Sequence, residues 1–164
     1  MKVDSRRNSV GPSFSGWSER LTLCVSASST ISSYSSRSPT VAAMLQSLKP
    51  EKSITSAGLV GLEGQDMEPT ARNVAESNGL ACGPHIAKKL TAELCQDSDL
   101  ILVMESRQKE RISKRFPEAS GKTFLLTQWN GKNDIPDPYK RGRDAFERVY
   151  PMMEKATRAW AEKL

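Results

Sequence analysis

One stretch near the start of the chain limits the possible folds most, because it reads as a strand, a polar loop and a helix. Leu21–Val25 alternates in polarity and is apolar enough for a buried strand. Ser38 and Pro39 then mark a helix start, with Ser38 as the N-cap and proline in the first helical position. Arg37 stands at the mouth of the loop, where its guanidinium can bind two oxygens of a phosphate.

This arrangement suits an anion. The N–H groups of a helix N-terminus point outward, and the positive end of the helix dipole lies there. An ordinary turn between a strand and a helix, with a solvated arginine, gives the same local pattern. The rest of the chain therefore has to decide between a phosphate site and a plain turn.

The length of 164 residues is typical of a single domain with a sizeable core. Residues 1–20 lack periodicity, so we expect a flexible leader, followed by one domain over residues 21–164. The net charge of +5 favours an anionic substrate, but no basic stripe with interleaved aromatic residues indicates nucleic-acid binding. No apolar run is long enough to span a bilayer, so membrane insertion is not expected.

The cysteines and the histidine argue against a metal site. The three cysteines Cys24, Cys82 and Cys95 have unrelated spacings, and His85 is the one histidine. Neither a zinc site nor a disulfide framework fits this pattern. We therefore expect reduced thiols in a cytoplasmic protein without metal or cofactor, with Cys82, Cys95 and His85 in structural roles.

Alternating strands and helices predict an α/β fold with a parallel sheet covered on both faces, a three-layer sandwich. The predicted strands are Leu21–Val25, Ser53–Leu59, Asp99–Met104 and Lys122–Leu126. The predicted helical segments are Ser38–Leu48, Ala71–Ser77, Pro84–Leu90, Thr91–Cys95, Ser106–Phe116 and Gly142–Leu164. In such sheets ligands bind beyond the carboxyl ends of the strands, so the loops that carry Arg37 and Asp137 are expected at one edge.

Arg37 and Asp137 together suggest phosphoryl-transfer chemistry. An arginine among backbone N–H groups stabilises a phosphoryl transition state, and an aspartic acid opposite can protonate the leaving oxygen. Prolines on both sides of Asp137 stiffen its loop, and Tyr139 offers an aromatic wall to a flat substrate. A thiolate with a lowered pKa near a helix N-terminus would complete the site as the nucleophile.

Six short motifs stand out between Arg37 and Leu164. They are Arg-Ser-Pro-Thr (37–40), Ser-Ala-Gly-Leu (56–59), Asp-Leu-Ile-Leu-Val-Met-Glu (99–105), Gly-Lys-Thr (121–123), Ile-Pro-Asp-Pro-Tyr (135–139) and Ala-Phe-Glu-Arg-Val-Tyr (145–150). In this order and spacing they resemble the low-molecular-weight protein-tyrosine phosphatases, and most closely the bacterial branch encoded with exopolysaccharide-export tyrosine kinases. The resemblance implies a four-stranded parallel sheet, no metal and a cysteinyl-phosphate mechanism.

The resemblance also assigns roles. It makes Asp137 the general acid, Arg37 the phosphoryl-binding residue and Tyr139 an aromatic wall, with the 60–64 loop as a further wall. Ser38 corresponds to the serine that hydrogen-bonds the thiolate, and Ser36 occupies a position where bacterial members often carry a second cysteine.

The nucleophile departs from the family's Cys-x5-Arg-Ser loop. Counting six residues back from Arg37 gives Ile31, which cannot attack phosphorus. With a gap, the strand resembles the family's first strand and makes Cys24 the equivalent cysteine, with about seven additional loop residues. A buried strand thiol of low reactivity is the alternative role for Cys24.

Three hypotheses follow. The first is hydrolysis of phosphotyrosine through Cys24, on a phosphotyrosine protein that resemblance suggests is a bacterial tyrosine autokinase. The second is a pseudophosphatase that binds inorganic phosphate or phosphotyrosine without hydrolysis, because Ile31 occupies the ungapped nucleophile position. The third is a damaged gene, in which the leader and the loop have drifted from those of an active ancestor.

Overall fold

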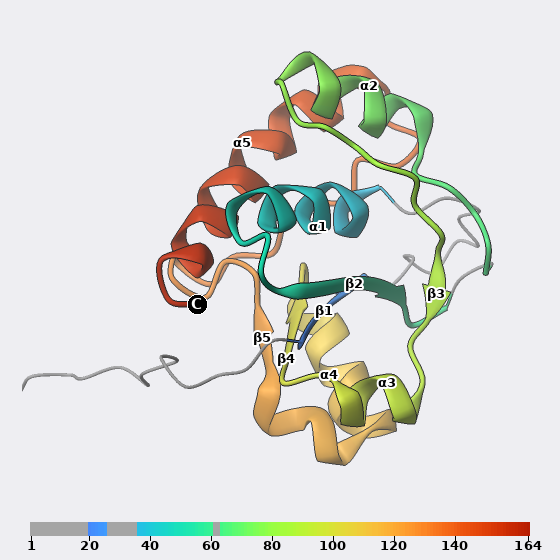
Figure 1. Cartoon of the computed structure of the whole chain (residues 1–164), viewed down its shortest axis with the longest axis vertical. Helices are drawn as coiled ribbons and strands as arrows, with labels where there is room; N and C mark the ends of the chain where they lie inside the picture. The colour runs from blue at the N-terminus through green and yellow to red at the C-terminus, as the bar shows by residue number, and fades with distance from the viewer. Residues whose placement is uncertain (1–19, 26–35, 61–62) are drawn as a thin grey trace, which may run out of the picture.

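The fold is a five-stranded sheet between two layers of helices in the computed structural model, which describes residues 20–25, 36–60 and 63–164 (Figure 1). The strands are β1 (Arg20–Val25), β2 (Ser53–Gly58), β3 (Lys88–Lys89), β4 (Leu100–Val103) and β5 (Thr123–Leu125). The helices are α1 (Arg37–Leu48), α2 (Pro69–Ser77), α3 (Ala92–Asp97), α4 (Ser106–Arg115) and α5 (Arg143–Ala161), with a 3₁₀ helix η1 (Pro117–Lys122). The expected leader lies outside the described residues except for Arg20, which is the first residue of β1.

All the strand pairs are parallel, in the order β3-β2-β1-β4-β5. The chain leaves central β1 toward β2 and later returns to the other side of β1 as β4. The connections after β1 and β4 therefore diverge to opposite faces of the sheet. A crevice at the carboxyl ends of two such strands is the usual ligand position in open parallel sheets.

Helices α1, α2 and α5 cover one face of the sheet, and α3, α4 and η1 cover the other (Figure 1). Each layer has its own apolar cluster. Apolar and aromatic residues recur at helical spacing along α5, and this pattern predicts a buried face. The prediction is confirmed, because every residue of that face is buried: Phe146, Val149, Tyr150, Met153, Ala156 and Trp160. The α/β sandwich expected from the sequence is thus the observed fold.

The expected helix over Pro84–Leu90 is wrong, because this segment is extended and contains β3. Backbone hydrogen bonds to distant residues hold it: Ala87 N–H donates to the Gln65 carbonyl at 2.8 Å, and Leu90 N–H donates to that of Gly58 at 2.8 Å. These bonds override a local helix preference. They also add a two-residue edge strand, so the sheet has five strands instead of the expected four.

The start of α1 differs from the expectation by two positions. The N-cap is Ser36 rather than Ser38, and Arg37 is the first helical residue. Pro39 then lies in the third helical position, which is allowed because first-turn N–H groups have no acceptor within the helix. The Thr40 hydroxyl donates to the Ser36 carbonyl at 2.8 Å. Arg37 therefore belongs to the helix itself and not to the preceding loop.

Another correction concerns α4, whose N-cap is Glu105 and not Ser106. The Gln108 side chain accepts a hydrogen bond from the Glu105 N–H at 3.2 Å, so a residue within the first turn ties down the cap. This placement orients Glu105 at the end of β4.

None of the helices that the structure describes has both the length and the apolar character needed to cross a membrane.

We predict that Trp160→Ala lowers the free energy of unfolding by about 3–5 kcal/mol, the usual cost of removing a buried aromatic side chain. Trp160 is fully buried, packs edge-on against Trp129, and donates a 2.8 Å hydrogen bond to the Leu126 carbonyl. Urea denaturation monitored by circular dichroism measures the change. Met152→Ala, at an exposed position of the same helix, is the control and should cost far less. Similar losses in both variants would contradict this account of the core.

Candidate active site at the carboxyl edge of the sheet

Arg37 is a charged side chain in an unusual position, because it is fully buried in the first turn of α1. Burial removes the guanidinium from water, and the positive end of the helix dipole opposes its charge. Such a cation is stable only when anionic or strongly polar acceptors surround it. Its partners therefore define the site.

Two carboxylates from other elements meet this guanidinium. Arg37 Nη2 lies 2.7 Å from Glu105 Oε1 and 3.6 Å from Asp137 Oδ2, and Nη1 donates to the Ile135 carbonyl. The Glu105 contact is short but poorly aligned with the N–H direction. Nη2 and Nε consequently have no hydrogen-bond acceptor of good geometry among the described residues.

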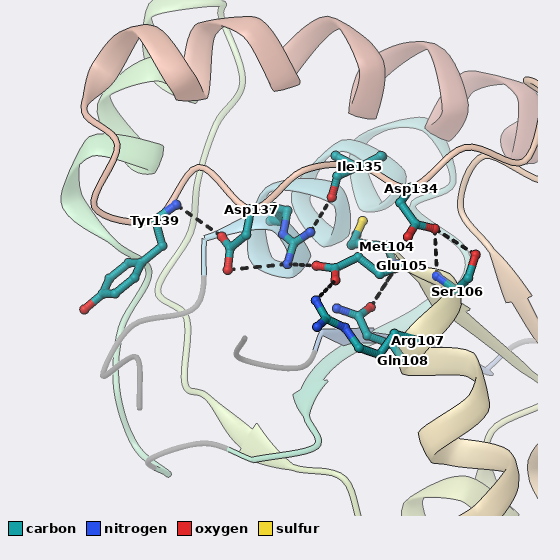
Figure 2. Close-up of polar contacts among 10 residues, drawn as sticks. Met104, Glu105, Ser106, Arg107, Gln108, Asp134, Ile135, Asp137 and Tyr139 are labelled. Carbon is teal, nitrogen blue, oxygen red and sulfur yellow. Dashed lines mark hydrogen bonds and ion pairs between the residues drawn. The ribbon is translucent and has the colours of Figure 1, made fainter. Parts of the chain in front are cut away.

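Glu105 lies two residues after Val103, the last residue of β4, so it stands at the carboxyl edge of the sheet. Its side chain is only 12% exposed, and its second oxygen lies 3.1 Å from Arg107 Nη2 (Figure 2). No role of Glu105 was predicted from the sequence. One sequence signal could have identified Glu105 as a site residue. It follows the most apolar predicted strand of the chain, so it belongs at the same edge of the sheet at which Arg37 was expected.

The Asp137 loop is tied to the end of β4 by backbone and side-chain bonds. Ile135 N–H donates to the Met104 carbonyl at 2.9 Å. Asp134 accepts hydrogen bonds from the Ser106 N–H and hydroxyl at 2.7 and 2.8 Å (Figure 2). These ties fix the loop at Asp134 and Ile135, and Asp137 follows two residues after Ile135. The expectation that Arg37 and Asp137 meet at one edge agrees with this geometry.

Asp137 lines a cleft of about 470 Å³. The residues that line this cleft are Glu105, Arg107, Asp134, Ile135, Pro136, Asp137, Tyr139, Lys140 and Arg141. Tyr139 lies at one end of the group and donates its N–H to Asp137 Oδ1 at 3.2 Å, whereas Ser106 and Asp134 lie at the other (Figure 2). Within the described ranges, no three metal-binding side chains gather into a site.

The structure gives less detail for the remaining predicted site residues. Ser36 and Ser38 are both buried at the start of α1, beside Arg37. The backbone of Cys24 lies in β1, level with Ala57 of β2 and Val103 of β4. Its position is therefore one residue before the end of β1, at the carboxyl edge of the sheet. Ile31 lies in the 26–35 segment, outside the described residues.

Two other residues singled out in the sequence lie at a separate cavity of about 200 Å³, which Cys82 and His85 both line. Ser56 Oγ is 3.4 Å from His85 Nε2. Burial lowers the pKa of His85 and raises the pKa of Cys82. Cys95 is fully buried elsewhere, and burial raises its pKa to about 11. Cys82 and Cys95 are free thiols, and neither has the lowered pKa of a nucleophile.

A family profile described as "Low molecular weight phosphotyrosine protein phosphatase" matches residues 32–164. The chain belongs to this family. It is 43% identical over 128 residues to the probable low molecular weight protein-tyrosine-phosphatase AmsI of Erwinia amylovora, an alignment that covers 78% of this chain and 89% of AmsI.

Solved structures agree with the family assignment. The AmsI crystal structure superposes with a TM-score of 0.82 at 40% identity, covering 92% of this chain and 97% of AmsI. Vibrio vulnificus Wzb in complex with benzylphosphonate superposes with a TM-score of 0.80 at 38% identity, covering 90% of this chain and all of Wzb. The fold inferred from the sequence motifs is therefore that of the phosphatase family.

We predict that Glu105→Gln lowers the free energy of unfolding by about 2 kcal/mol, because removing one charge of a buried pair leaves the other poorly compensated. Denaturant titration measures the loss. Glu154→Gln is the matched control, since Glu154 pairs with Arg158 at 3.0 Å on the exposed face of α5. An exposed pair of this kind contributes about 0–1 kcal/mol. Equal effects of the two substitutions would show that Glu105 does not hold Arg37.

Proposed function

We propose that this protein hydrolyses phosphotyrosine through a cysteinyl-phosphate intermediate. The observation that carries the proposal is the contact between Arg37 and Asp137 beside the N-terminus of α1. An arginine, a helix N-terminus and a facing carboxylic acid supply the charge stabilisation and the proton donor that cleavage of an aryl phosphate needs. Family membership and the names of the relatives support the same activity.

In this proposal Arg37 binds the phosphoryl oxygens. Its Nε and Nη2 lack well-aligned acceptors among the described residues, so these donors suit the oxygens of a bound phosphate. Ser36 and Ser38, buried at the start of α1, supply further polar groups around the phosphoryl group. The benzylphosphonate bound by Vibrio vulnificus Wzb is an aryl-methyl phosphonate, and this supports a ligand with a ring next to the tetrahedral anion.

Cys24 is the proposed nucleophile. Its thiolate attacks phosphorus and forms a P–S bond while the bond from phosphorus to the phenolic oxygen breaks. Asp137 donates its proton to that oxygen, so tyrosine leaves as the neutral phenol. The position of Cys24 near the end of β1, at the edge where Arg37 and Asp137 meet, supports this role.

The second half of the reaction uses the same residues. A water molecule attacks the phosphorus of the cysteinyl phosphate, and the Asp137 carboxylate accepts the proton that the water loses. The P–S bond breaks, phosphate leaves, and the Cys24 thiolate is restored. Tyr139 provides the wall beside the aromatic ring, which its position at one end of the cleft supports.

The substrate is, in this proposal, a phosphotyrosine on a bacterial tyrosine autokinase of exopolysaccharide export. The sequence motifs of that branch and the relatedness to AmsI support this assignment. We further propose a cytoplasmic location, which the two free thiols Cys82 and Cys95 support because thiols persist in reducing compartments.

A phosphate-binding protein without hydrolysis is the second candidate. Ile31 stands six residues before Arg37, where the family loop carries its nucleophile, and the family profile matches only from residue 32 onward. In this case phosphate or a phosphotyrosine peptide binds to Arg37 but no turnover follows. Calorimetric titration of the wild type and of Arg37→Ala distinguishes this candidate from a protein that binds no phosphate.

We predict that the wild type hydrolyses p-nitrophenyl phosphate at mildly acid pH. Cys24→Ala should abolish turnover, because no other group is proposed to attack phosphorus. Asp137→Asn should lower the turnover of a phosphotyrosine peptide by about 10²–10⁴-fold, the usual contribution of a general acid. Steady-state kinetics measure both effects.

The controls separate the two candidates. Glu154→Gln, on α5, should keep wild-type kinetics. Turnover that persists in Cys24→Ala would exclude the Cys24 mechanism, and phosphate binding without turnover in the wild type would favour the binding protein.

We also predict that iodoacetate modifies Cys24 before Cys82 and Cys95. The thiolate is the reactive form, and burial raises the pKa of both Cys82 and Cys95. Peptide mass spectrometry after short exposure identifies the modified residue, and inorganic phosphate should slow the modification by occupying the site. Faster modification of Cys82, with activity retained, would remove Cys24 as the reactive thiol.

A further inference from the structure

The cleft that contains Asp137 carries more charge than the proposed chemistry uses. Six charged residues line it: Glu105, Arg107, Asp134, Asp137, Lys140 and Arg141. Their formal charges cancel, so the sum predicts no preference between acidic and basic substrates. The ion pairs and hydrogen bonds of these six residues are unevenly distributed along the cleft, and this distribution does predict a preference for one substrate charge.

The acidic residues of the cleft are already engaged. Glu105 is shared between Arg37 at 2.7 Å and Arg107 at 3.1 Å. Asp134 accepts two hydrogen bonds from Ser106 at the start of α4. Asp137 faces Arg37 at 3.6 Å. Glu105 and Asp137 therefore face cations, and Asp134 is held in place by hydrogen bonds from a neutral residue.

Lys140 and Arg141 differ from the other charged residues of the cleft. Both are exposed, and no carboxylate of the described residues lies within ion-pair distance of either side chain. The Lys140 ammonium instead lies 5.4 Å from the centre of the Tyr139 ring. One end of the cleft thus has two cations without an anionic partner, and the other end has Asp134, a carboxylate held by hydrogen bonds from Ser106.

The backbone holds these two cations close to the proposed proton donor. Arg141 N–H donates to the Pro138 carbonyl at 3.0 Å, which closes a turn directly after Asp137. Lys140 adopts a positive φ of 58° within this turn. A peptide in extended form advances about 3.3 Å per residue. A residue next to the phosphotyrosine is therefore within reach of the long side chains of Lys140 and Arg141.

We propose that Lys140 and Arg141 form a basic rim that selects phosphotyrosines flanked by acidic residues. This inference rests on the proposed function, since it concerns the substrate of the same site. Opposite charges across an interface speed encounter and favour one partner over others. The substrate class is therefore an acidic phosphotyrosine segment of a protein.

The experiment compares two phosphotyrosine peptides of equal length, one with aspartate and glutamate on both sides and the other with asparagine and glutamine. We expect wild-type kcat/KM to be about 5-fold higher for the acidic peptide, the size that two exposed ion pairs give together. The double variant Lys140→Gln with Arg141→Gln should bring the ratio close to one. Raising the salt concentration to 0.5 M should also reduce the wild-type ratio, because salt screens exposed charges.

A matched control tests whether the net charge of +5 causes the preference by itself. Lys155→Gln with Arg158→Gln removes the same two charges from exposed positions of α5. This double variant should keep the wild-type peptide ratio. The single variant Arg141→Gln, with an intermediate ratio expected, serves if the rim double variant is unstable by circular dichroism.

The possible outcomes distinguish a failure of the rim proposal from a failure of the proposed function. Suppose that the wild type hydrolyses p-nitrophenyl phosphate. Equal kcat/KM values for the two peptides would then overturn the inference and leave the proposed function intact. The same conclusion would follow if the ratio of kcat/KM between the peptides were unchanged in the rim double variant. If the wild type shows no turnover, dissociation constants from fluorescence anisotropy replace kcat/KM and the same 5-fold preference is expected. Absence of both turnover and binding would overturn the inference and the proposed function together.

Discussion

The buried guanidinium of Arg37 is the interaction on which the site depends. It lies at the end of a helix whose dipole repels it, and it is shielded from water, so it requires the carboxylates of Glu105 and Asp137. These two residues come from segments that follow different strands. The ion pairs therefore join the first turn of α1 to the connections after β4 and β5. A site of this kind therefore requires that β1, β4 and β5 are paired in the sheet.

Much of the fold was predictable because its elements carry local signals. The strand β4 is a run of buried apolar residues, and α5 repeats its apolar residues at helical spacing. The edge strand β3 was missed, since its two lysines show no strand pattern and backbone bonds to distant residues create it. The first residue of α1 was also misplaced, because proline is compatible with more than one position of a first helical turn.

In the candidate site, too, some residues could be predicted from the sequence and others could not. Arg37 and Asp137 could be paired in advance, since loops after parallel strands share one edge of the sheet. Glu105 could not, because a carboxylate after a strand resembles any solvated acid until its buried partner is known. The role of Cys24 stays a prediction. Its strand position is described, but the nucleophile also depends on the segment 26–35, which lies outside the described residues.

The anchoring of the loop at Ile135 has a consequence for how related proteins can diverge. The Ile135 N–H bonds to a backbone carbonyl at the end of β4, so the start of the loop is held by main-chain atoms. Side chains five and six residues farther along can be exchanged without disturbing that attachment. Under the proposed function, partner choice can therefore drift through mutation of Lys140 and Arg141, while Asp137, the proposed acid, keeps its alignment.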